Sequence, residues 1–131
     1  MLSLGPGVQI VLATSPVDLR CGHDGLATLV RTMWKDDPYS GTLFVFLGRR
    51  MDRVKVLFFH AGGFTIYYRR LERGRFTMPR IPEGATRVEL DATSLAMLLD
   101  GVDLRVVRRA PRWEPARAKK RTEGIDISRA S

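Results

Sequence analysis

The sequence predicts an α+β fold, in which a small antiparallel sheet of about four to five strands packs with two helices and a basic C-terminal tail follows. Three observations predict it. Apolar runs bounded by glycine succeed one another through the middle of the chain, as in a meander of strands. Two other segments carry apolar residues at helical spacing. Residues 105–131 are basic and contain two prolines with little apolar spacing. We therefore predict one domain over residues 1–104 and a tail without a core of its own.

The first elements are a strand and a helix. Residues 8–13 are rich in β-branched and aliphatic side chains and end at the turn sequence 14–16, which predicts a strand. Asp24 is a candidate helix N-cap, and a helix is predicted over residues 25–35. Its apolar residues at i, i+3, i+4 and i+7 are Leu26, Leu29, Val30 and Met33. The turn-forming residues 36–41 then reverse the chain.

The centre of the chain predicts three strands, over residues 42–47, 54–59 and 64–68. The pair Gly62-Gly63 can adopt the positive φ angles of a tight hairpin, so successive strands are predicted to pair antiparallel. The first two runs are apolar on both faces. This pattern fits either a covered central sheet or a protein interface on the second face, and the sequence leaves both open.

One more strand and a second helix complete the domain. Residues 88–90 predict a short strand, and Asp91 is placed to cap a helix that runs from Ala92 to about Asp100. Gly101 stands where left-handed C-caps occur.

Positive charge is concentrated in two stretches. Residues 49–80 carry nine Lys and Arg against two Asp and Glu, residues 105–121 carry eight against one, and the whole chain is +8. Clustered cationic charge attracts polyanions such as nucleic acid, and the planar guanidinium fork of Arg suits phosphate. The residues predicted to bind nucleic acid are Arg49, Arg50, Arg53, Lys55, Arg73, Arg75, Arg117, Lys119, Lys120 and Arg121.

Structural roles for some of these arginines compete with this interpretation. Those at 49–53 could form a solvated turn that pairs with acidic side chains, and exposed pairs of that kind contribute only about 0–1 kcal/mol. Arg69 and Arg70 are neighbours on a predicted strand, so they point to opposite faces. At least one of them is expected to pair with an acid such as Glu72 or Asp18.

Catalytic and metal chemistry find little support in the residues. The aspartates show no spacing typical of a two-metal nuclease. Cys21, His23 and His60 are too few and too scattered for a structural zinc site. We therefore expect no catalytic residue, no metal and no cofactor. With a single cysteine, no signal sequence and no apolar run near the roughly 20 residues of a membrane span, we expect a cytoplasmic protein.

Five ordered blocks of the chain resemble a known family. They are PVDLR at 16–20, GHDGL at 22–26, FVFLGRR at 44–50, DRVKVL at 52–57 and YRRLERGRF at 68–76. In their order and spacing, over roughly residues 8–105, they are similar to the small accessory protein of insertion sequence family 66 (IS66). That protein is often called TnpB and is unrelated to the RNA-guided nucleases that share the name.

The resemblance implies a non-enzymatic protein required for transposition alongside a separate DDE transposase. Two hypotheses follow for its partner. The protein binds DNA, at the transposon ends, through its Arg-rich surface; or it is an adaptor that docks onto the transposase or another transposon-encoded protein without touching DNA.

Overall fold

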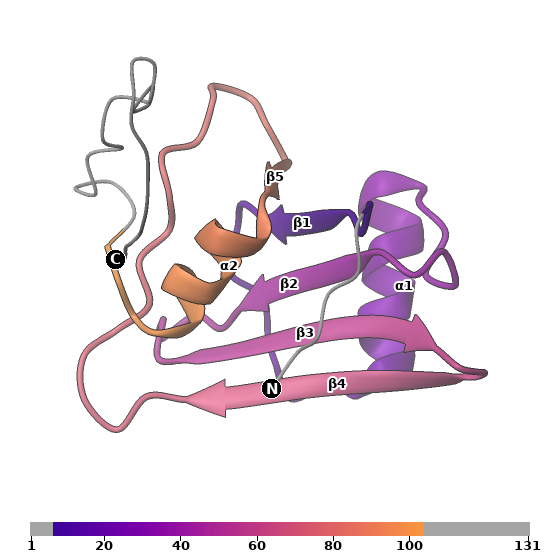
Figure 1. Ribbon diagram of the computed structural model, residues 1–131, viewed down its shortest axis with the longest axis horizontal. Coiled ribbons are helices and arrows are strands. Elements are labelled where there is room, and N and C mark those ends of the chain that lie inside the picture. Colours follow the sequence, from indigo (N-terminus) through magenta and orange to yellow (C-terminus); the bar gives the residue numbers. More distant parts are fainter. Residues whose placement is uncertain (1–6, 104–131) are drawn as a thin grey trace, which may run out of the picture.

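A computed structural model describes residues 7–103, which form one five-stranded sheet and two helices (Figure 1). The elements are β1 (Ile10–Ala13), α1 (His23–Trp34), β2 (Leu43–Leu47), β3 (Arg53–His60), β4 (Gly63–Arg70), β5 (Arg87–Leu90) and α2 (Ala92–Leu99). The predicted tail, with Arg117, Lys119, Lys120 and Arg121, lies outside the described residues. Within 7–103, neither helix has the length and apolar character that crossing a membrane demands.

The strand order is β4-β3-β2-β1-β5. β2, β3 and β4 form the predicted antiparallel meander, and β5 pairs antiparallel with β1. The predicted α+β class is therefore confirmed, with one parallel pair added, between β1 and β2. That pair is parallel because α1 carries the chain back to the end of the sheet where β1 began.

The two helices cover opposite faces of the sheet (Figure 1). Alternate residues of β2 divide between them: Val45 packs in a cluster with Leu98 of α2, and Phe44 and Phe46 pack in a second cluster with Leu26 of α1. All of β2 is buried. The apolar character of both faces thus reflects a covered central sheet, one of the two interpretations that the sequence allows.

The structure corrects two local predictions. α1 begins before Asp24, with Gly22 at the N-cap position and no side-chain cap, so Asp24 lies in the first turn instead of capping the helix. There its carboxylate still faces the positive end of the helix dipole. The hairpin between β3 and β4 turns at Ala61 and Gly62, which have φ angles of 49° and 82°, while Gly63 already pairs with His60.

The predicted caps of α2 are confirmed. The Asp91 carboxylate accepts a hydrogen bond from the Ser94 backbone N–H at 2.7 Å, and Gly101 follows the helix with a φ of 82°. The Asp91 cap satisfies one of the N–H groups that a helix start leaves without an intrahelical partner.

Candidate nucleic-acid interface

An open groove of about 710 Å³ lies at the end of the sheet where β2 finishes and β3 begins. Its lining residues are Val17, Asp18, Leu19, Arg20, Gly48, Arg49, Arg50, Asp52, Arg53, Lys55, Ile66 and Tyr68. Five of them are cationic and two are anionic, which gives this lining a net charge of +3. We call it the arginine groove.

A tight turn presents two of the arginines. The Met51 N–H donates to the Gly48 carbonyl at 2.9 Å, which makes residues 48–51 a β-turn with Arg49 and Arg50 at its centre. Both side chains are exposed. Met51 takes a left-handed φ of 64° and packs against the α2-side core, which fixes the turn to the sheet. The prediction of a hairpin turn between two core strands is confirmed.

The segment after β1 forms the facing wall of the groove. The Val17 N–H donates to the Leu47 carbonyl at 2.9 Å, and Val17 pairs in parallel with Gly48. A Cβ atom at Gly48 would lie 3.2 Å from Cδ1 of Leu19, which is tighter than nine in ten real Cβ contacts, so Leu19 would have to shift by a few tenths of an ångström. Glycine at position 48 therefore allows residues 17–20 to approach the turn.

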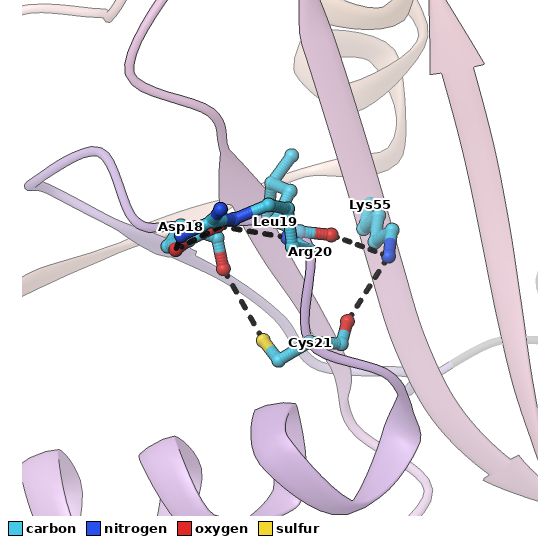
Figure 2. Close-up of polar contacts among 5 residues, drawn as sticks. All are labelled: Asp18, Leu19, Arg20, Cys21 and Lys55. Atoms are coloured by element: carbon cyan, nitrogen blue, oxygen red, sulfur yellow. Dashed lines mark hydrogen bonds and ion pairs between the residues drawn. The ribbon is translucent and has the colours of Figure 1, made fainter.

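Lys55 ties that segment to β3 (Figure 2). Its ammonium donates to the Leu19 carbonyl at 2.6 Å and to the Cys21 carbonyl at 3.0 Å, and it lies 5.8 Å from the ring centroid of Tyr68. Two of its three N–H groups are thus committed to backbone carbonyls. Lys55 lines the groove, but it contributes more to holding the wall than to offering hydrogen bonds to a ligand.

Replacing Lys55 with methionine is expected to lower the free energy of unfolding by about 1–3 kcal/mol, because two partly buried carbonyls lose their donor. Urea denaturation measures the change. Arg80 is exposed, so Arg80→Met serves as the control and should stay within about 0.5 kcal/mol. Equal effects of the two substitutions would contradict the assigned tether.

Asp18 and Arg20 form a forked ion pair on the same wall (Figure 2). Arg20 Nε donates to Asp18 Oδ1 at 3.0 Å, and Arg20 Nη2 donates to Oδ2 at 2.7 Å. The Arg20 side-chain hydrogen bond, followed by that of its backbone N–H, holds the pKa of the Asp18 carboxyl well below its ordinary value of 3.8. The charge of Arg49 lowers this pKa further by a smaller amount. The Arg20 side chain is 90% exposed despite the pair, so it still faces solvent.

This pair predicts a pH dependence of stability. A carboxyl whose pKa is lower in the folded state stabilises the protein above its unfolded pKa, and that contribution is lost as the pH falls. Asp18→Asn should therefore be less stable than the wild type by a constant amount above about pH 5, and the difference should shrink below about pH 4. Urea denaturation of both proteins across this range measures it. A difference that does not vary with pH would show that the pair does not couple to folding.

Arg53 enters the groove from the start of β3. Its Nε lies 3.9 Å from Asp52 Oδ1, too far for a hydrogen bond but close enough for an ion pair. Within residues 7–103 these two buried atoms have no hydrogen-bond partner. Arg53 also lies directly opposite Arg70 on β4. Like charges at such a cross-strand pair repel each other, and here a carboxylate lies near each guanidinium, Asp52 near Arg53 and Glu72 near Arg70.

Arg73 and Arg75 lie on a neighbouring turn and do not line the groove. That turn is attached to the first one, because the Leu71 N–H donates to the Asp52 carbonyl at 2.8 Å and the Phe76 N–H donates to the Met51 carbonyl. Phe76 is buried at 2% exposure, whereas both arginines are exposed. The predicted residues therefore divide into a groove set, Arg49, Arg50, Arg53 and Lys55, and an adjacent pair.

The two arginines at the end of β4 make ion pairs, as the competing interpretation predicts. Arg69 lies 3.3 Å from Asp100, and Arg70 lies 3.4 Å from Glu72. Their side chains belong to opposite faces of the strand, so only Arg70 shares the face of the groove.

Two groove side chains that are able to contact a nucleic acid, Arg20 and Tyr68, do not belong to the predicted set. Arg20 lies outside the basic stretches but inside the PVDLR block. Tyr68 alternates with Ile66 along β4, so strand periodicity places both on the face of Lys55. Among residues 7–103, no group of three or more His, Cys, Asp and Glu is arranged to hold a metal ion.

Comparison with known proteins confirms the resemblance seen in the sequence blocks. The model of the family described as IS66 Orf2 like protein matches residues 8–109. Two proteins of Sinorhizobium fredii are similar along almost their whole length. The protein y4jC is 36% identical over 116 residues, which cover 87% of this chain and 97% of the relative. The protein y4hO is 36% identical over 117 residues, which cover 89% and 98%.

No solved structure matches the chain. The family assignment therefore depends on sequence, where the matched region includes every helix and strand described above and all of the arginine groove. The chain belongs to the IS66 Orf2-like family and is an accessory protein of insertion-sequence transposition.

Proposed function

We propose that the protein binds DNA through the arginine groove and acts, without catalysing a reaction itself, together with a separate DDE transposase. The observation that carries the proposal is the convergence of three separate segments on one open groove. Residues 17–20, the turn 48–51 and the start of β3 together place four arginines around it. Concentrated guanidinium groups at an accessible surface suit the phosphate backbone.

The arginines of the groove are positioned for contact with solvent-exposed anions. Arg49 and Arg50 project from the centre of a turn, and Arg20 is fixed in direction by Asp18 while remaining exposed. A side chain that is oriented before binding loses less conformational entropy when a phosphate arrives. The groove can therefore offer one oriented donor from Arg20 and two exposed guanidinium groups from Arg49 and Arg50.

The two carboxylates of the groove support a non-catalytic role. Asp18 is held by two nitrogens of Arg20, and Asp52 faces the guanidinium of Arg53. A metal-dependent nuclease needs carboxylates that converge on metal ions. Here each carboxylate lies next to an arginine, and its negative charge orients that guanidinium group.

A fluorescence-anisotropy titration of the full-length protein with a labelled duplex tests DNA binding. If about six phosphates are neutralised by the groove, the adjacent turn and the tail, log K should fall with log salt at a slope near −5. No binding at low salt, or a flat salt response, would refute the proposal. The contribution of the tail to DNA affinity is measured with a variant in which four residues are replaced by glutamine: Arg117, Lys119, Lys120 and Arg121.

An adaptor role is the second candidate, and an aromatic cluster in which Tyr39 is exposed and Phe59 and Phe64 are half-buried favours it. Tyr39, Phe59 and Phe64 lie with ring centroids 5.0 to 5.2 Å apart at the far end of the β3–β4 hairpin from the groove. Tyr39 is 52% exposed. Aromatic side chains at an accessible surface are typical of protein interfaces. Co-purification with the transposase that survives nuclease and high salt, and is lost in Tyr39→Ser, would support this role.

A further inference from the structure

Tyr68 is an exposed aromatic side chain inside a cationic groove. It is 49% exposed, lies directly across the sheet from Lys55 in the β3–β4 register, and lines the groove with Ile66. Phosphate contact alone does not require an aromatic ring. A ring beside arginines is, however, the arrangement with which proteins stack the bases of single-stranded nucleic acid.

The Tyr68 ring has a cationic neighbour that restrains it before any ligand binds. The Lys55 ammonium lies 5.8 Å from the Tyr68 centroid, and two carbonyls hold that ammonium in place. A cation near the ring restrains it by a cation–π interaction, while half of the side chain remains accessible. A base that stacks there loses little extra entropy by ordering the tyrosine.

The size of the groove also favours an unpaired nucleotide. Its volume of about 710 Å³ lies within the range of about 300–1,000 Å³ that is typical of small-molecule sites. In a duplex, both faces of a base are covered by its neighbours in the stack, so the Tyr68 ring could not reach them. An unpaired base can place one face on the ring while its flanking phosphates meet Arg49 and Arg50 at the rim.

We infer that the arginine groove binds an unpaired nucleotide of single-stranded DNA, with the base stacked on Tyr68 and the phosphates held by the surrounding arginines. This inference rests on the proposed DNA-binding function and specifies its substrate. A strand freed from pairing, at a DNA end or a locally opened site, is the form of DNA that the groove accepts.

The test compares a labelled oligodeoxythymidylate with a fully paired, blunt-ended duplex in anisotropy titrations of the full-length protein. Tyr68→Val removes the ring but places on the strand another residue type that is common in strands. It should lower affinity for the single strand about 5- to 100-fold and change duplex affinity less than about twofold. Tyr68→Phe keeps the ring and should bind the single strand nearly as the wild type does. Tyr39→Val removes an equally exposed tyrosine at the other end of the sheet and should change neither affinity.

The results separate this inference from the proposed function. If replacing Arg49, Arg50 and Arg53 together with glutamine weakens binding but Tyr68→Val affects both DNA forms equally or neither, the stacking inference is overturned and DNA binding stands. If neither kind of substitution has an effect, both fail. A single strand that contains 2-aminopurine gives a measurement on the wild type that needs no variant. Its fluorescence should be quenched on binding by stacking on the ring, and unchanged fluorescence on saturation would overturn the inference.

Discussion

Replacing Arg49, Arg50 and Arg53 together with glutamine lowers the affinity for DNA by a factor of about 100 or more at low salt. Each guanidinium that meets a phosphate makes a charge-assisted hydrogen bond, and three losses of at least about 1 kcal/mol each combine to this factor. All three residues line the groove. Anisotropy titrations measure the change. They are made at about 50 mM salt, because phosphate contacts contribute most to affinity when the salt concentration is low.

A second triple variant controls for net charge. Arg31, Arg80 and Arg87 lie outside the groove lining, and their replacement by glutamine removes the same charge. If affinity came from the overall field of the protein, the two triple variants would weaken binding equally. The groove model requires the first to lose far more than the second, so equal losses would refute it.

Replacing Phe76 with alanine lowers the free energy of unfolding by about 3–5 kcal/mol, the range for a buried phenylalanine. Phe76 is 2% exposed and packs in the cluster that contains Leu95 and Leu98 of α2. Its backbone N–H also donates to the Met51 carbonyl. The buried ring and this hydrogen bond together attach the turn that carries Arg73 and Arg75 to the turn beside the groove. Urea denaturation followed by circular dichroism measures the loss.

Two further substitutions, Phe76→Leu and Met33→Ala, serve as controls for this prediction. Leucine refills part of the cavity and should cost less than alanine. Met33 is 38% exposed on α1, so its truncation should cost under about 1 kcal/mol. A loss below about 1 kcal/mol for Phe76→Ala would show that the turn is held by its backbone hydrogen bonds and not by the buried ring.

The elements that the sequence predicts well are those specified by local residues. The meander follows from apolar runs separated by turn residues, and the α2 cap follows from Asp91 at the start of an apolar helix. The parallel pairing of β1 with β2 depends on the path that α1 takes between them. No local residue pattern predicts that path. The predicted start of α1 is wrong because aspartate is a common N-cap residue, which made Asp24 the candidate. The helix instead begins earlier, with Gly22 at the N-cap position.

The candidate site divides in the same way. Arg49 and Arg50 could be placed on a turn because glycine and apolar runs flank them. The role of Lys55 could not be predicted, because its carbonyl partners lie more than 30 residues away in the sequence. Arg20 and Tyr68 reach the groove only when β4, β3, β2 and β1 are assembled in that order. A tertiary site of this kind becomes visible once strand order is known.

The central claim is that DNA contacts the protein at the arginine groove. The most direct measurement is a titration of ¹⁵N-labelled full-length protein with a short single-stranded oligonucleotide, followed by amide chemical shifts. The largest and saturable changes should fall at residues 18–20, 48–53 and 66–68. Changes confined to the aromatic cluster around Tyr39, or to residues beyond 103, would contradict the claim.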